Sequence, residues 1–138
     1  MPTIANATDL WPSILDLTEE ETPLSVLKAQ AEALSDRTRH AVSGWVITTV
    51  VEGGKKYNQE FSVIAPVLGA QARVPILTLK HLVAASFPID CDALTLTDPF
   101  HDSKRVSTMD ELKDWLRLQL ASDRTMKVVS RLYSQVSG

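Results

Sequence analysis

The feature that most constrains the fold is Gly53-Gly54, a glycine pair that separates two segments of strand-like composition. The first, residues 40–51, is dense in β-branched and aromatic side chains, and the second, residues 56–65, alternates apolar and polar side chains over most of its length. Glycine adopts the positive φ angles of tight hairpin turns at little steric cost. The pattern therefore predicts an antiparallel hairpin. A phosphate-binding loop is disfavoured, because the glycines lead neither into a helix start nor into a Gly-Lys-Ser/Thr sequence.

The first of these strands, residues 40–51, carries apolar side chains at both odd and even positions. A strand that is apolar on both faces is usually covered on both, so we expect it to be central in its sheet and Trp45 to lie in the core. Lys55 and Lys56 are expected to be solvated turn residues that discourage pairing between sheet edges.

The middle of the chain predicts two further strands. Residues 72–80 form the third, and Pro75 requires that this strand be either an edge or bulged, since proline cannot donate to the ladder. Residues 81–86 are compatible with strand or helix, and a continuing strand is preferred. After the break at Phe87-Pro88, residues 89–97 form the fourth strand. One face of it carries Ile89, Cys91, Ala93 and Thr95.

Helical segments flank this region on both sides. Thr22-Pro23 is a typical helix start, and apolar residues follow it at three- and four-residue steps. Thr108 and Glu111 fit a capping box at a second helix whose Trp115 is expected in the core, and Ser122 or Asp123 begins a third. The expected fold class is α+β: an antiparallel sheet of about four strands (a β-meander) with an N-terminal helix and C-terminal helices packed on it.

The expected domain organisation is one α+β domain over residues 22–138, preceded by an N-terminal arm over residues 1–21. The arm mixes isolated large apolar side chains with prolines and an acidic run. We expect it to be partly ordered against the body of the protein. The alternative is an arm that is swapped onto, or docks on, a partner.

Charge and cysteine content restrict the partners and the compartment. The formal net charge of -3 and the scattered basic residues argue against nucleic-acid binding, which needs a basic surface. A single cysteine, Cys91, can form no internal disulfide, which favours a cytoplasmic location. No signal peptide, lipidation signal or run of about 20 apolar residues is evident, so no membrane association is expected.

The most suggestive polar cluster lies between residues 90 and 102. Carboxylates and imidazole bind divalent cations, so Asp90, Asp92, His101 and Asp102 are the candidate metal ligands, with Asp98 close by. The interpretation we favour is simpler. Two aspartates spaced two apart share one face of a strand, and aspartate is common in turns. No catalytic residue and no cofactor are predicted.

Three other reactive side chains have plainer explanations. His81 lies in an apolar run, where a hydrogen-bonded or boundary histidine is expected, and His40 marks an exposed helix-to-strand junction. Cys91 is expected to be packing rather than a nucleophile, because no thiol-enzyme signature surrounds it.

These features favour a small cytoplasmic protein-binding or regulatory module without catalytic activity, such as an adaptor. Its size and acidity are those of chaperone-like or immunity-like proteins, but no motif ties it to a family. Because residues 40–51 are apolar on both faces, a second chain is expected to cover part of the surface, which predicts a homodimer. The alternative is a metal-dependent enzyme or small-ligand-binding domain that uses the region from Asp90 to Asp102.

Overall fold

The computed structural model describes residues 10, 20–69, 72–94 and 103–137. It has an α+β fold, as predicted, with a sheet of five strands rather than about four. Among the described residues, no helix has the length and the apolar run that a membrane crossing requires. In chain order the elements are α2 (Pro23–Arg37), β1 (Ser43–Val51), β2 (Lys56–Ile64), the short 3-10 helix η1 (Pro66–Leu68), β3 (Arg73–Leu82), β4 (Ile89–Ala93), β5 (Ser103–Val106), α3 (Met109–Leu120) and α4 (Asp123–Ser137).

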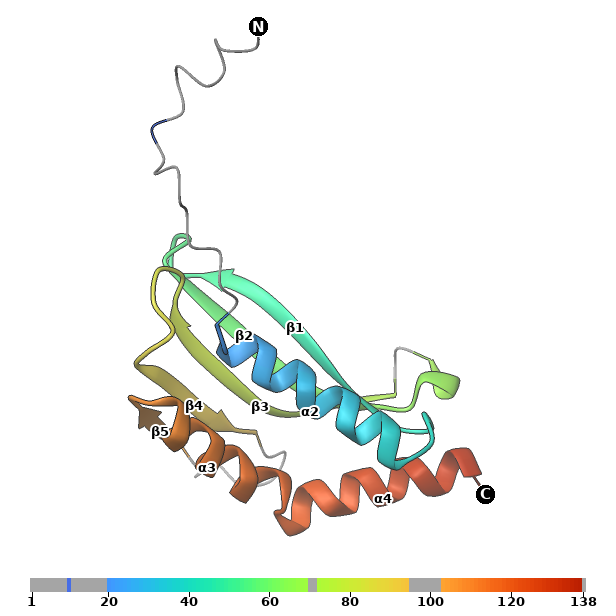
Figure 1. Cartoon of the computed structure of the whole chain (residues 1–138). Helices are drawn as coiled ribbons and strands as arrows, with labels where there is room; N and C mark the ends of the chain where they lie inside the picture. Colours follow the sequence, from blue (N-terminus) through green and yellow to red (C-terminus); the bar gives the residue numbers. More distant parts are fainter. Residues whose placement is uncertain (1–9, 11–19, 70–71, 95–102, 138) are drawn as a thin grey trace, which may run out of the picture.

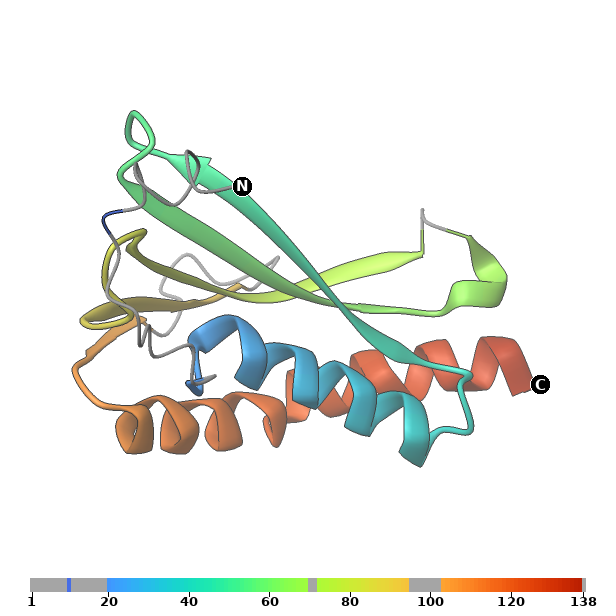
Figure 2. The same ribbon diagram turned by 45° about the horizontal axis from the view of Figure 1, so that its top comes forward.

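The sheet is a simple meander in which every pair of neighbouring strands is antiparallel, in the order β1-β2-β3-β4-β5 (Figure 1). The three helices lie on one side of it (Figure 2). Buried apolar side chains from the strands meet those of the helices between the two layers, among them Phe61, Leu77, Leu112 and Trp115. The expected core position of Trp115 is thereby confirmed.

The three helix starts predicted from capping chemistry are confirmed, the third by α4, which begins at Asp123 with the Ser122 hydroxyl accepting from the Thr125 N–H. Thr22 caps α2 by accepting a hydrogen bond from the Ser25 backbone N–H, and Pro23 occupies the first helical turn, where no donor is needed. Thr108 caps α3 by accepting from the Glu111 N–H at 3.2 Å. These side chains satisfy backbone donors that the helix itself leaves without acceptors.

The hairpin predicted at the glycine pair is also confirmed. Val51 pairs with Lys56, and residues 52–55 form the loop between them. Glu52, Gly53 and Gly54 all have positive φ angles in this loop. Two of those three positions are glycine, the residue that adopts such angles most readily.

Pro75 lies in a β-bulge of the central strand β3. Ser62 pairs with Pro75 and Phe61 pairs with Leu77, so Ile76 is the extra residue. Of the two predicted alternatives, edge or bulge, the bulge is correct. The Ile76 carbonyl, displaced by the bulge, accepts hydrogen bonds from the Leu94 N–H at 2.8 Å and the Arg124 guanidinium of α4 at 3.1 Å.

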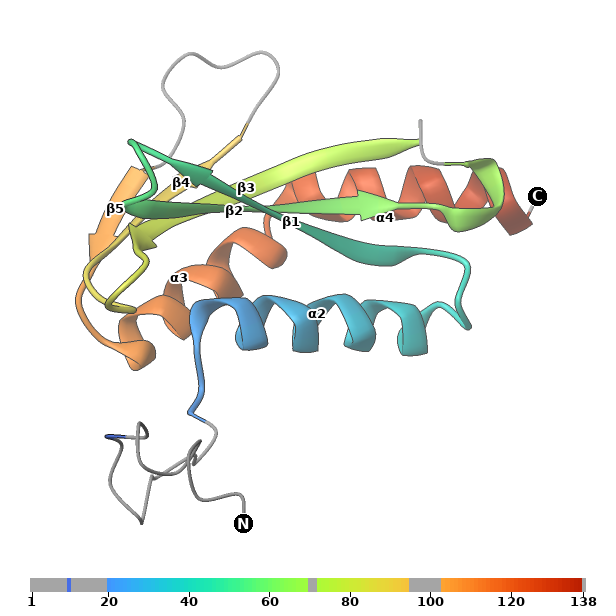
Figure 3. The same ribbon diagram turned by 90° about the horizontal axis from the view of Figure 1, so that it is seen from above.

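The prediction that residues 40–51 form a central strand with Trp45 in the core was wrong. β1 is an edge strand of the sheet, and the Trp45 side chain is 52% exposed. α2 packs on one face of β1, and no described helix covers the opposite face (Figure 3). A Cβ on Gly44 would meet Ala31 of α2, so the side chain of the next residue, Trp45, lies on that opposite face. β-branched residues favour any strand, so their density did not distinguish an edge from the centre.

Two boundaries also differ from the prediction. β3 ends at Leu82, and residues 83–86 form a turn, so neither a continuing strand nor a helix occupies the rest of 81–86. β4 ends at Ala93, with Ile89, Cys91 and Ala93 buried on one face as expected; Thr95 lies outside the described residues. The unpredicted fifth strand, β5, is only four residues long and has no apolar alternation that would reveal it.

Candidate functional site

The two strand aspartates of the predicted acidic cluster are engaged within the sheet. Asp90 pairs with Arg105 across β4 and β5, with 2.9 Å between Oδ1 and Nε, and Asp92 accepts a hydrogen bond from the Ser103 hydroxyl. The hydrogen bond from Arg105 lowers the pKa of Asp90, which keeps this carboxyl ionised and paired. These contacts are those of a solvated sheet face.

The other members of that cluster, Asp98, His101 and Asp102, lie outside the described residues. Among the described residues, no three Asp, Glu, His or Cys side chains are grouped closely enough to hold a metal ion. A metal site that includes His101 and Asp102 therefore stays a prediction.

The outer edge of β1 is the first notable surface of the molecule. The two odd-numbered residues that flank β2 form backbone hydrogen bonds with the side of the sheet on which β3 lies. The Lys55 carbonyl accepts from the Val83 N–H at 2.9 Å, and the Ala65 N–H donates to the Ala72 carbonyl at 3.4 Å. Backbone groups alternate in direction along a strand, so the even-numbered residues of β2 face β1. Since Val51 pairs with Lys56, the odd-numbered residues of β1 bond to β2. The even-numbered residues direct their N–H and C=O groups outward: Gly44, Val46, Thr48 and Val50.

The side chains of β1 do nothing to discourage pairing at this edge. The strand is nine residues long and contains no charged residue and no proline. Trp45 is 52% exposed and Val50 58% exposed. The other edge is different, because β5 has only four residues and carries Lys104 and Arg105. Short length and charged side chains are the usual means by which sheet edges avoid pairing, so β5 has both of these protections and β1 has neither.

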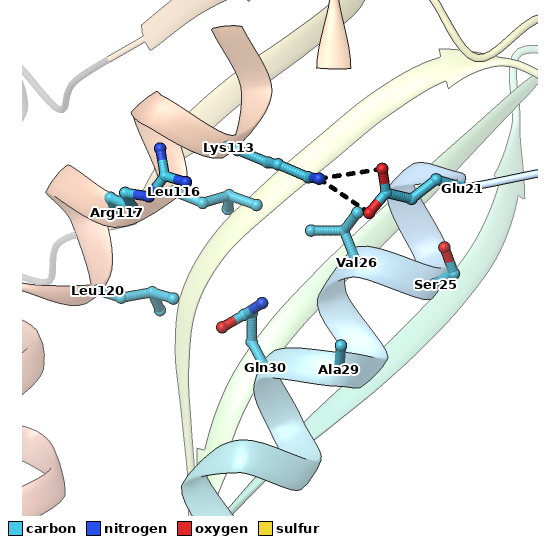
Figure 4. Close-up of a pocket in the computed structure, with 9 residues that line it drawn as sticks. All are labelled: Glu21, Ser25, Val26, Ala29, Gln30, Lys113, Leu116, Arg117 and Leu120. Carbon is cyan, nitrogen blue, oxygen red and sulfur yellow. Dashed lines mark hydrogen bonds and ion pairs between the residues drawn. The ribbon is translucent and has the colours of Figure 1, made fainter. Parts of the chain in front are cut away.

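A second surface feature is a hollow of about 270 Å³ between α2 and α3 (Figure 4). Val26 from α2 and Leu116 from α3 give it an apolar interior. At one end Lys113 reaches Glu21, with 3.0 and 2.9 Å between its Nζ and the two carboxylate oxygens. This ion pair bridges the start of α2 and the middle of α3. The hollow is small, and polar side chains, among them Gln30 and Arg117, line it beside the apolar ones.

A third feature is a larger hollow of about 380 Å³, bounded by the start of α2, strands β1 to β3 and the turn at residues 83–86. We call it the Gln59 pocket. Two polar side chains in its wall are buried: Gln59, which is 2% exposed, and His81, which is 7% exposed. The Tyr57 ring meets the His81 ring edge-on, with 5.7 Å between the ring centroids.

The hydrogen bonds of His81 indicate which tautomer of its neutral ring fits the fold. Its Nδ1 faces two carbonyl oxygens, those of Leu82 at 2.9 Å and Ala85 at 3.3 Å, so Nδ1 carries the proton and donates. In the neutral ring, Nε2 then accepts from the Gln59 Nε2 amide at 3.1 Å. The expectation of a hydrogen-bonded histidine at this position is confirmed. His81 thereby links strand β2 to the turn that follows β3.

Gln59 has one polar atom that the fold does not satisfy. With its amide nitrogen directed at His81, its Oε1 is directed elsewhere, and this buried oxygen has no hydrogen-bond partner among the described residues. A buried acceptor without a donor costs about 1–3 kcal/mol. No local motif predicts this pair, because Gln59 and His81 are 22 residues apart and meet only through the register of β2 with β3.

The Gln59–His81 pair leads to a prediction about stability. Replacing His81 with phenylalanine should destabilise the protein by about 1–3 kcal/mol, because the Gln59 carboxamide then loses its remaining partner while still buried. The double variant Gln59→Leu, His81→Phe should recover the part of that loss that comes from the unpaired carboxamide, whereas the carbonyls of Leu82 and Ala85 still lack the Nδ1 donor. Urea unfolding of the two single variants and the double variant measures this coupling. If the loss of stability in the double variant equalled the sum of the losses in the two single variants, the hydrogen bond between Gln59 and His81 would be contradicted.

The remaining candidates show no further chemistry. His40 is exposed, as expected, and its Nδ1 lies 2.8 Å from the Ser35 hydroxyl at the end of α2. Cys91 is buried in the core of the sheet. Comparison with known protein families, with curated proteins and with solved structures found no match to this chain.

Proposed function

We propose that the protein is a non-catalytic protein-binding module that binds through the outer edge of β1, and that the occupant of this edge is a second copy of the same chain. The observation that supports this most is the contrast between the two edges of the sheet. β1 is nine residues long and uncharged, whereas β5 is four residues long and carries two basic side chains. Addition of a strand to an open edge is a common mode of protein recognition.

The backbone of β1 is suited to pair with itself. Two copies related by a two-fold axis place their strands antiparallel, and overlap is complete when Ile47 lies opposite Ile47 of the second copy. In this register Val46 faces Thr48, and Gly44 faces Val50. All four residues are those whose backbone groups point outward, so the pairing forms roughly eight hydrogen bonds, two for each facing pair.

The side chains of β1 are compatible with the same register. It places Trp45 opposite Thr49 on the face of the sheet that the described helices leave open. Aromatic and β-branched residues opposite each other stabilise a sheet, and with no charge in β1 no like charges meet. A large exposed tryptophan would then lose much of its contact with water. A second copy is therefore favoured over an unrelated peptide.

The proposed location is the cytoplasm, and the proposed role is regulatory, with the dimer presenting a larger surface than one chain. The chain has a single cysteine, which is buried in the core and so gives no reason for an oxidising compartment.

Disulfide trapping tests this proposal. In the Ile47→Cys variant the two cysteines form a non-hydrogen-bonded pair, in which Cα atoms lie about 4.5 Å apart, a separation that a disulfide spans. Mild oxidation should therefore give a cross-linked dimer within minutes. Leu118→Cys is the matched control, because this α3 side chain is 71% exposed and remote from β1. Cross-linking of Ile47→Cys no faster than that of the control would contradict binding through the β1 edge.

A further inference from the structure

The Gln59 pocket has the size of a ligand site. Its volume of about 380 Å³ lies within the range of ~300–1,000 Å³ that is usual for small-molecule pockets. It is formed where five parts of the chain meet, namely the start of α2, strand β1, strand β2, the end of β3 and the turn after it. Of the residues that line the pocket, only Thr48 belongs to the outer edge of β1 through which we propose dimerisation.

Among the described residues that line the pocket there is no Asp, Glu, Lys or Arg side chain. His81 is held by two carbonyl acceptors and the Gln59 amide, so its ring atoms are already used. An ionic ligand would be desolvated here without a counter-charge, which is costly. The lining instead combines apolar surface, including Pro23, Leu24 and Val83, with the aromatic ring of Tyr57. This lining favours an uncharged ligand with a flat apolar body.

Gln59 supplies the polar specificity. Its Oε1 is a buried acceptor without a donor among the described residues. Along the sheet, Gln59 lies between Leu79 on β3 and Thr48 on β1, and since its amide nitrogen is turned to His81 of β3, the free oxygen lies on the opposite side of the carboxamide. The atom exposes almost no surface, but the terminal torsion of glutamine is broad, so a small rotation presents it to the pocket.

We propose that the Gln59 pocket binds a small uncharged molecule with a flat apolar body and an amide-type N–H or hydroxyl donor, and that this donor bonds to Gln59 Oε1. The apolar body lies against Tyr57 and the start of α2. The donor supplies the hydrogen bond that the fold leaves unmade. Ligands of the same shape that lack a donor, or that carry a charge, bind more weakly.

The test is a titration of the full chain with three probes of nearly equal shape, in which binding is monitored through the backbone amide signals in ¹H–¹⁵N NMR spectra. Benzamide has a neutral donor, acetophenone lacks the donor, and benzoate is an anion. Benzamide should cause saturable shifts at residues 57–59 and 81–86 and bind about five-fold more tightly than acetophenone, the ratio that one hydrogen bond is worth. Benzoate should cause no saturable shift at these residues.

Two variants make the assignment decisive. Gln59→Leu keeps the apolar volume and should abolish the difference between benzamide and acetophenone. Thr48→Phe fills the mouth of the pocket from an exposed position, so it leaves the fold intact and should weaken benzamide binding at least about ten-fold, the effect expected when a side chain occupies the ligand's place. Equal binding of benzamide and acetophenone to the wild type, shifts confined to the hollow between α2 and α3, or unchanged binding in Thr48→Phe would each overturn the proposal.

Discussion

Replacing Gly44 with alanine is expected to destabilise the protein by about 3 kcal/mol, near the upper end of the cost of overpacking a core. A Cβ on Gly44 would lie 2.7 Å from both the Cα and the Cβ of Ala31 on α2, and 2.8 Å from Cε1 of Phe61 on β2. The Cα belongs to the helix backbone, so no rotation of a side chain relieves the contact. The helix has to move away from the sheet, and the midpoint of thermal or urea unfolding measures the loss.

Two further variants separate this clash from other effects of losing a glycine. Gly53→Ala meets no atom within 4 Å but has a φ of 68°, so it should cost only about 1–2 kcal/mol of backbone strain. Adding Ala31→Gly to Gly44→Ala removes one of the clashing methyl groups and should recover part of the stability. If Gly44→Ala were as stable as the wild type, α2 would not lie as close to β1 as the structure has it.

The double variant Trp45→Lys, Thr49→Lys is expected to weaken self-association about 100-fold or more. In the centred register these residues face each other twice, so four lysines meet across the two-fold axis, and the apolar contact of Trp45 is lost as well. Both side chains are exposed, so the fold of one chain should be unaffected. Sedimentation across a concentration series gives the dissociation constant.

The control for this variant is Leu118→Lys, an equally drastic change of an exposed apolar side chain on α3. It should leave the dissociation constant within about two-fold of the wild-type value, since surface changes away from a contact are nearly neutral. An effect of Leu118→Lys as large as that of the β1 variant would place the contact elsewhere. Unchanged association of the β1 variant would exclude the edge pairing.

Those parts of the fold that rest on local chemistry were predictable from the sequence. The caps at Thr22 and Thr108 follow from the hydroxyl groups that satisfy the first backbone donors of a helix. The hairpin at Gly53 and Gly54 follows from the positive φ angles that its loop requires. The bulge at Pro75 follows from the missing donor of proline. Each depends on residues within a few positions of one another.

The position of a strand within the sheet was not predictable in this way. β1 was expected at the centre because it is apolar on both faces, yet it lies at the edge with Trp45 exposed. Its place depends on which other strands pair with which, and no residue of β1 encodes that choice. β5 was not predicted because its composition is too little like that of a strand. With four residues, two of them basic, it has the composition of a loop and becomes a strand only by pairing with β4.

The candidate sites show the same division. Asp90 and Asp92 share a strand face, as their spacing predicts, but Arg105 and Ser103, which engage them, come from the strand that was missed. Gln59 and His81 become neighbours only through the register of β2 with β3. Their burial, and the unsatisfied Oε1 of Gln59, depend on packing over the whole sheet and have no counterpart in a local motif.

Self-association through β1 is the central claim, and sedimentation equilibrium of the wild-type chain over micromolar to millimolar concentrations tests it most directly. The expected result is a reversible increase in mass from 15.2 kDa to twice that value, without higher species, because a two-fold pairing of edges uses up both open edges. A mass that stays at 15.2 kDa throughout this range, or one that grows without limit, would contradict the pairing.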